Sequence, residues 1–229
     1  MAFGTVYGSV KSPRVGMVLS TAALLGLPVE NASNTLPGSF PKGLAEKFPI
    51  QKIPVFVGAD GICLWQSIAI ASFFASYDPL GIVGGATALA KAEVLMWACF
   101  FNQEFYDAVI PWVAGRMRSI PYDPKTEEKA KKNTFSIFAV LERQVKDKEF
   151  LVGEDPTIAD AAAVASLYFV LSSVMTKDEL AKFPEIQRYY INAYPKLKFD
   201  QLCGPLQLLS EPVPIPKAPP SPILTCDEL

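Results

Sequence analysis

The sequence predicts an α/β unit with a mixed four-stranded sheet, followed by an all-helical unit. Short apolar runs typical of strands occur only before residue 80, where they alternate with helical patterns. Glycine, proline and aspartate then gather at residues 78–85, which indicates a boundary. From residue 87 onward the apolar residues recur at helical spacing. We therefore expect the units at residues 1–80 and 87–200, with a proline-rich tail at 201–229 that is extended or disordered from Pro205.

The first unit is predicted to contain strands and helices in strict alternation until a final hairpin. The expected strands are residues 5–7, 29–32, 55–57 and 62–64, and the expected helices are 13–25, 44–48 and a third from Ser67. Pro13 is tolerated in a first helical turn. The sequence Gly-Ala-Asp-Gly at 58–61 suits a four-residue hairpin loop. This order of elements predicts a thioredoxin-like domain, with helices on both faces of the sheet.

Aromatic residues dominate the first helix of the second unit, predicted to end near residue 115. Six large aromatic side chains are more than one buried face of a single helix accommodates. They are expected either to make core and dimer contacts or, together, to line an apolar pocket. They are Trp97, Phe100, Phe101, Phe105, Tyr106 and Trp112. A helix at 125–145 has one apolar face. Thr157 and Asp160 form a predicted capping box before a helix of small residues.

Composition excludes several kinds of activity. The 21 Lys and Arg residues against 23 Asp and Glu leave no net positive charge to attract nucleic acid or an anionic membrane. The absence of histidine excludes Ser-His-Asp and Cys-His catalysis and histidine metal ligation. The four cysteines form no CxxC pair, and we expect Cys63 and Cys99 to be buried structural thiols. Thiol chemistry would therefore need a thiol carried by a ligand, and no metal site is predicted.

Residues 52–70 contain the predicted binding site. Pro54 begins a strand, and a cis Ile53–Pro54 bond costs little free energy at an X-Pro position. The backbone groups beside this proline stay free to pair with a bound peptide. Gln66 and Ser67 place a carboxamide, a hydroxyl and helix N-terminal amides where a carboxylate can bind. The arrangement suits a small anionic peptide.

These motifs resemble the glutathione-binding core of the glutathione transferase superfamily, in which a cis-proline and a Glu/Gln-Ser pair hold the tripeptide. The capping box and residues 183–195 are similar to the helical domain of that superfamily, so the likeness extends over residues 4–200. The resemblance implies that Lys52 meets the glycine carboxylate and that the Ile53 backbone, next to Pro54, pairs with the cysteinyl unit. It also implies that Gln66 and Ser67 hold the γ-glutamyl end.

The resemblance implies a homodimeric enzyme that lowers the pKa of the glutathione thiol for attack on a hydrophobic electrophile, including a role in fungal secondary metabolism. The group that acts on the thiol is expected near the start of the first helix. Ser12 is our first candidate, and Tyr7 and Arg14 are the others. The serine of the family commonly lies two residues before the proline, and Lys11 occupies that place here.

A second hypothesis follows from a narrower likeness. Residues 4–7, Ser12 to Arg14, residues 48–54 and the Asp60-Gly61 turn look most like the transferase-like domain of the gamma subunit of translation elongation factor 1, and like its small fungal relatives. The alternative function is therefore a non-catalytic interaction module. Fold alone does not decide between the two.

Two cellular locations are compatible with the sequence. The apolar run 15–27, a glycosylation sequon at Asn31 and the tail 226–229 together indicate the endoplasmic reticulum. Cleavage after residue 27 would, however, remove a strand and a helix that the predicted fold requires. We therefore predict a cytoplasmic protein, and no stretch is long and apolar enough to span a membrane.

Overall fold

A four-stranded mixed sheet forms the core of the N-terminal unit in the computed structural model, which describes residues 2–117 and 119–215. The strands are β1 (Gly4–Tyr7), β2 (Val29–Ala32), β3 (Val55–Gly58) and β4 (Cys63–Trp65). Their order is β2-β1-β3-β4. β1 runs parallel to β2 and antiparallel to β3, and β3 runs antiparallel to β4. The predicted thioredoxin-like sheet is confirmed.

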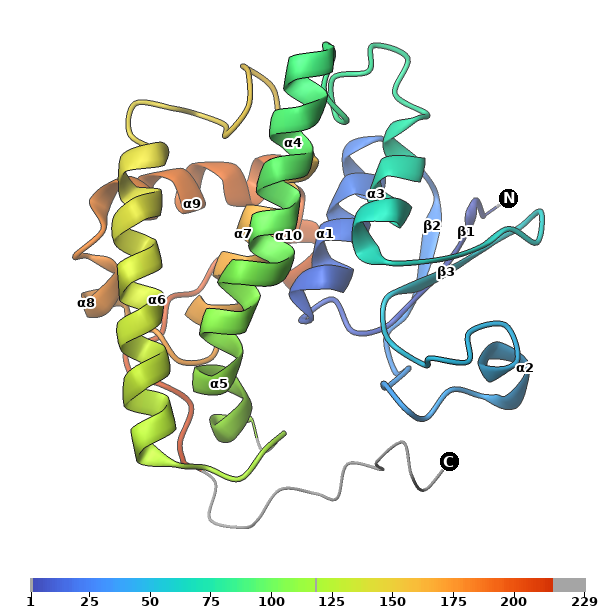
Figure 1. The fold of residues 1–229 in the computed structure, drawn as a ribbon. Coiled ribbons are helices and arrows are strands. Elements are labelled where there is room, and N and C mark those ends of the chain that lie inside the picture. Colours follow the sequence, from blue (N-terminus) through green and yellow to red (C-terminus); the bar gives the residue numbers. More distant parts are fainter. Residues whose placement is uncertain (1, 118, 216–229) are drawn as a thin grey trace.

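Each face of the sheet is covered by helices because side chains alternate along a strand. Val6 and Phe56 pack with α1 (Pro13–Leu24) and α3 (Ser67–Ala75). On the opposite face, Tyr7 and Val55 pack in a cluster with residues of α2 (Lys42–Ala45) and the loops beside it. Figure 1 shows α1 and α3 between the sheet and the helical unit. These two helices therefore touch both units.

The C-terminal unit is entirely helical within its described residues, apart from one isolated β-bridge. Its elements are α4 (Ala88–Phe100), the π-helix η1 (Phe101–Phe105), α5 (Tyr106–Arg116), α6 (Pro124–Gln144), α7 (Ile158–Leu171), α8 (Lys177–Leu180), α9 (Pro184–Lys196) and α10 (Phe199–Cys203). The long helix predicted to end near residue 115 thus changes its hydrogen-bond pattern midway, at η1. The two-unit fold class is confirmed. None of the helices in the described part of the chain has both the length and the apolar character needed to cross a bilayer.

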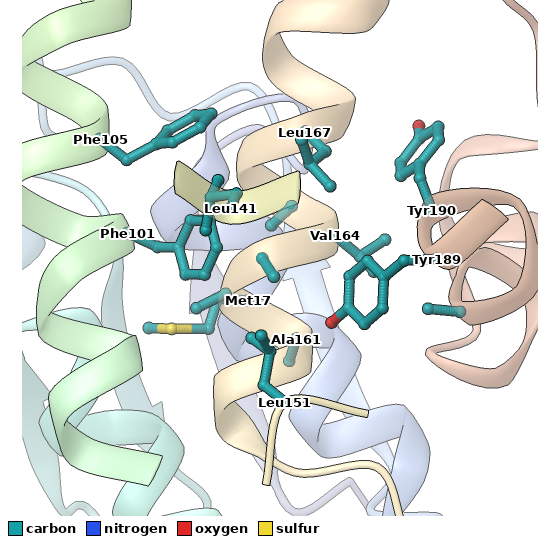
Figure 2. Packing of buried hydrophobic residues seen from close by; sticks show 14 of the residues in the cluster. Met17, Phe101, Phe105, Leu141, Leu151, Ala161, Val164, Leu167, Tyr189 and Tyr190 are labelled. Carbon is teal, nitrogen blue, oxygen red and sulfur yellow. The ribbon is translucent and has the colours of Figure 1, made fainter. Parts of the chain in front are cut away.

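Helix α7 is the centre of the helical unit. Only Tyr168 and Phe169 among its 14 residues are not fully buried. Figure 2 shows Phe101 and Phe105 on one side of α7, and Tyr189 and Tyr190 on the other. The run of alanines on α7 lets these neighbours approach closely, which is how small residues fill a densely packed core.

Helix α1 packs directly against α7 and so joins the two units. A Cβ atom added to Gly16 would lie 3.3 Å from the Cβ of Ala165 and 3.0 Å from the carbonyl oxygen of Val10. The hydroxyl of Ser20 donates a buried hydrogen bond of 2.7 Å to the carbonyl of Leu197. Glycine at position 16 therefore sets the separation of the two helices.

The described part of the proline-rich tail is held against the helical unit. The amide of Val213 donates to the carbonyl of Ser173 at 2.9 Å, and the amide of Lys177 donates to the carbonyl of Leu209 at 2.8 Å. Arg116 donates to the carbonyl of Val213 at 2.7 Å. The chain is thus extended but hydrogen-bonded to the helical unit as far as Val213. The rest of the predicted tail, residues 216–229 and so also the segment 226–229, lies outside the described residues.

The capping box at the start of α7 is present and fully buried. The carboxylate of Asp160 accepts hydrogen bonds from the amides of Leu151 and Thr157, the hydroxyl of Thr157 and the hydroxyl of Tyr189, at 2.8–3.0 Å. Burial raises the pKa of this carboxyl, and the hydrogen bonds act in the opposite direction. Asp160 therefore connects the loop before α7, the first turn of α7 and α9.

We predict that Asp160→Ala lowers the free energy of unfolding by roughly 2–4 kcal/mol, because four buried donors lose their acceptor. Asp123 is a matched control, since it caps α6 at the protein surface with bonds to Lys125 and Thr126. Asp123→Ala should lower the free energy of unfolding clearly less than Asp160→Ala does. Urea unfolding followed by far-ultraviolet circular dichroism measures both. Equal losses would show that burial of the Asp160 network adds nothing to its capping role.

Candidate functional site

A cavity of about 390 Å³ opens where both units meet. Four segments line it: the loop before β3 with the start of that strand, the corner between β4 and α3, the first turn of α1, and η1 of the helical unit. The lining residues are Arg14, Lys47, Phe48, Pro49, Ile50, Gln51, Lys52, Ile53, Pro54, Val55, Trp65, Gln66, Ser67, Asn102 and Gln103. The site therefore depends on the docking of the two units.

The Ile53–Pro54 bond at the edge of the cavity is cis. Val55 enters the sheet directly afterwards and pairs with Tyr7 and Trp65. Among the described residues, no protein group pairs with the backbone amide or carbonyl of Ile53. Ile53 thus presents a free donor and acceptor to a ligand lying along this segment, which is the arrangement of an added strand.

Gln66 and Ser67 form the second edge of the cavity, at the start of α3. Gln66 has φ of 70°, and its exposed side chain makes no capping bond. The first amides of α3 have no partner within their own helix, and the helix dipole makes this end electropositive. Ser67 is only 2% exposed, and its hydroxyl donates to Oδ1 of Asn102 at 3.2 Å. The corner can bind a carboxylate.

Arg14 reaches the cavity from α1 and is held by η1. Its Nε donates to Oδ1 of Asn102 at 3.0 Å, and its Nη2 donates to the carbonyl oxygen of Asn102 at 2.9 Å. The guanidinium carbon lies 4.0 Å from the centre of the Tyr106 ring, a distance typical of a cation–π contact. Asn102 therefore contacts both Arg14 and Ser67.

The charges at the cavity have a single sign. Arg14, Lys47 and Lys52 line it, and none of its lining residues is acidic. A concave surface with several cations and apolar walls concentrates the field, so it attracts anions. Phe48, Ile50 and Trp65 supply apolar surface beside these charges. The site suits a small ligand that carries carboxylates and also has an apolar part.

The structure brings together most of the predicted site residues. Lys52, Ile53, Pro54, Gln66, Ser67 and Arg14 all line the cavity. Ser12 and Tyr7 are not among the lining residues. Ser12 is the N-cap of α1 and its hydroxyl makes no capping bond, while Tyr7 packs in the cluster around α2. The roles of all these residues stay predictions.

Several lining residues were not predicted from the sequence as part of the site, among them the polar residues Lys47, Gln51, Asn102 and Gln103. The only sequence signal for Asn102 is an amide that interrupts a run of aromatic residues in a helix. Those aromatic residues, considered above as pocket walls, are not among the lining residues; Phe101, Phe105 and Trp112 are instead buried in the core. The rings that do line the cavity, Phe48 and Trp65, come from the N-terminal unit.

Other sequence predictions are corrected or qualified by the structure. Cys63 and Cys99 are free thiols and are half-buried rather than buried. The run at 15–27 largely forms α1, whose residues 15–22 are buried between the units. The side chain of Asn31, in the sequon, donates to the carbonyls of Val6 and Gly8 at 3.2 and 2.9 Å. Both segments are therefore integral parts of the fold.

Comparison with known proteins agrees with this architecture. Residues 2–76 match the glutathione S-transferase N-terminal domain, and residues 93–194 match the glutathione S-transferase C-terminal domain. A glutathione S-transferase-like protein of a Fusarium species is 30% identical over 210 residues, which cover 90% of this chain and 95% of that protein. The chain therefore belongs to the glutathione S-transferase family.

The similarity to elongation factor 1-gamma is higher in identity but covers only part of that protein. Elongation factor 1-gamma of Schizosaccharomyces pombe is 41% identical over 218 residues, which are 95% of this chain. The chain spans 53% of the length of that relative. The solved glutathione S-transferase-like domain of elongation factor 1-gamma from Saccharomyces cerevisiae has the same fold, with a TM-score of 0.76 and 21% identity over 95% of this chain and 100% of that one. The predicted family resemblance is confirmed.

We predict that Ser67→Ala lowers the free energy of unfolding by about 1 kcal/mol, because the hydrogen bond to Asn102 between the two units is lost. Ser72→Ala is the matched control on α3, since Ser72 is exposed and does not line the cavity. That variant should stay within about 0.5 kcal/mol of the wild type. Chemical denaturation measures both, and identical values would mean that the Ser67 bond does not stabilise the junction.

Proposed function

We propose that this protein binds glutathione in the cavity and acts as a glutathione transferase on hydrophobic electrophiles. The observation that carries the proposal is the combination of three cations, the free backbone of Ile53 and the Gln66-Ser67 corner in one cavity without an acidic lining residue. Membership of the glutathione S-transferase family supports it. Glutathione carries two carboxylates, one ammonium group and a thiol, so its charges complement this surface.

The proposed orientation of glutathione follows the order of the lining segments. Lys52 pairs with the glycine carboxylate, and the Ile53 amide and carbonyl pair with the backbone of the cysteinyl unit. Gln66, Ser67 and the first amides of α3 hold the γ-glutamyl carboxylate. A neutral Gln66 gives up the charge pairing that a glutamate would offer the ligand ammonium, worth around 1 kcal/mol at an exposed site.

The proposed reaction is nucleophilic attack by the glutathione sulfur. The thiol loses its proton to solvent, the thiolate forms a bond to an electrophilic carbon, and a group such as a halide leaves with the electron pair of its bond. A positive charge near the sulfur lowers the thiol pKa. Of the three predicted catalytic residues, Arg14 lies at the cavity, so we place this role on Arg14 ahead of Ser12 and Tyr7.

The second candidate is a non-catalytic interaction module in the cytoplasm, which the 41% identity to elongation factor 1-gamma favours. In either case we propose a homodimer. Apolar side chains that are at least half exposed support it: Leu89, Leu95 and Met96 on α4, with Trp65 on β4. If the protein co-purifies with a partner protein and does not bind glutathione, the interaction-module hypothesis is favoured.

We predict that the wild-type protein binds glutathione and that Lys52→Ala weakens this binding about three- to tenfold, because a charged contact to a carboxylate is lost. Isothermal titration calorimetry measures both dissociation constants. Lys42→Ala is the control, since Lys42 is exposed on the neighbouring α2 and does not line the cavity. No binding by the wild type would refute the proposed function, and an equal effect at Lys42 would refute the role of Lys52.

We predict that Arg14→Gln moves the pH profile of conjugation to higher pH. With the guanidinium in place, the pKa of the bound thiol lies below the value of about 8.5 typical of a free thiol, so the thiolate is present at lower pH. Loss of the charge returns that pKa toward the free value. The pH dependence of kcat/KM with an aryl halide measures the shift. An unchanged profile would assign activation of the thiol to another group.

A further inference from the structure

Asn102 is one of two polar residues, with Gln103, that the described part of the helical unit contributes to the lining of the ligand cavity. It lies in η1, the π-helix between α4 and α5, and such π turns frequently occur at functional sites. Its side-chain oxygen accepts hydrogen bonds from Nε of Arg14 at 3.0 Å and from Oγ of Ser67 at 3.2 Å. Its backbone carbonyl accepts a third bond, from Nη2 of Arg14 at 2.9 Å. One residue thus contacts both Ser67, to which we assign the γ-glutamyl end, and Arg14, to which we assign the thiol.

The orientation of the carboxamide follows from the chemistry of its partners. The Nε of arginine can only donate, so the group facing it must be the oxygen. The amide nitrogen of Asn102 therefore lies on the other side, and no described protein group accepts a hydrogen bond from it. Asn102 itself is one of the residues that line the cavity.

The neutrality of Asn102 distinguishes Arg14 from two other arginines, Arg116 and Arg188, each of which pairs with a carboxylate. Arg116 pairs with the Glu127 carboxylate at 2.6 Å, and Arg188 pairs with that of Glu185 at 2.8 Å. Arg14 is bound instead by an amide oxygen, a peptide carbonyl and the face of Tyr106. Its guanidinium is held in place while its positive charge remains uncompensated, which a carboxylate at position 102 would not allow.

We infer that Asn102 is a positioning residue of the ligand site, which holds the Arg14 guanidinium at the cavity without neutralising its charge and so adapts the site to an anionic ligand. This inference rests on the proposed function in taking glutathione as the ligand. The geometry itself calls only for an anion. A substitution that keeps the hydrogen bonds but adds a negative charge separates this role from a structural one.

Asn102→Asp is that substitution, because an aspartate can accept the same bonds from Arg14 and Ser67. We expect the variant to unfold at the wild-type temperature or above it, since an ion pair to Arg14 is gained. We expect its dissociation constant for glutathione to rise roughly tenfold, a change of the size expected for losing a charged contact. Asn133→Asp, an exposed position on α6, makes the same chemical change away from the cavity and should leave both quantities unchanged. Unaltered affinity in a stably folded Asn102→Asp protein would overturn the inference.

A second pair of variants tests whether Asn102 acts through Arg14. Asn102→Ala should weaken glutathione binding about threefold or more in the wild-type background, because the guanidinium is no longer held. It should have little further effect in the Arg14→Gln background, and this non-additivity is the signature of two residues that act together. A purely structural role predicts equal effects in both backgrounds and would overturn the inference.

Fluorescence titration with the apolar anion 8-anilinonaphthalene-1-sulfonate separates this inference from the proposed function. If the wild type binds this probe but not glutathione, and Asn102→Asp lowers the affinity for the probe, the proposed function fails and the role of Asn102 stands. If glutathione and the probe bind the wild type and Asn102→Asp equally well, the role of Asn102 fails and the proposed function stands. If the wild type binds neither, both are overturned.

Discussion

The close packing of α1 against α7 is the contact on which the rest of the structure depends. Gly16 allows the approach, because a side chain there would meet Ala165 of α7 and the backbone of Val10. The same helix covers one face of the sheet through Val15 and Val18. A single helix is therefore part of both cores, and any change in its separation from α7 would move the sheet relative to the helical unit.

The ligand cavity is a direct consequence of that docking. Arg14 lies in the first turn of α1, and its partner Asn102 belongs to the opposite unit. Ser67, at the start of α3, reaches the same amide oxygen. The side chains of Arg14 and Ser67 are thus fixed by contacts between the units. Lys47, Lys52 and the free backbone of Ile53, by contrast, belong to the N-terminal unit alone. Binding and the junction of the units are for this reason linked in one network.

The chemistry of this network favours recognition of an anion over proton transfer. The lining residues include no histidine and no carboxylate, so the cavity offers cations, amides and hydroxyls but no side chain suited to act as a general base near neutral pH. The positive field of Arg14 and of the α3 N-terminus stabilises an anion by charge and dipole. A thiol supplied by the ligand is the group that such a field can activate. The same field would also serve a module that only binds.

The sequence by itself determined those features that depend on neighbours along the chain. The succession of strands and helices along the chain, the capping box at Thr157 and Asp160, and the two edges of the site at Pro54 and at Gln66-Ser67 each follow from residues within about 20 positions, where turn chemistry and periodicity act. Tertiary structure decided which residue at the start of α1 faces the cavity, because successive helical residues point about 100° apart and only packing sets the rotation. It also decided the pairing of Arg14 with Asn102, which are 88 positions apart in the chain. No local pattern encodes a contact of that span, since it exists only once α1 has docked on α7.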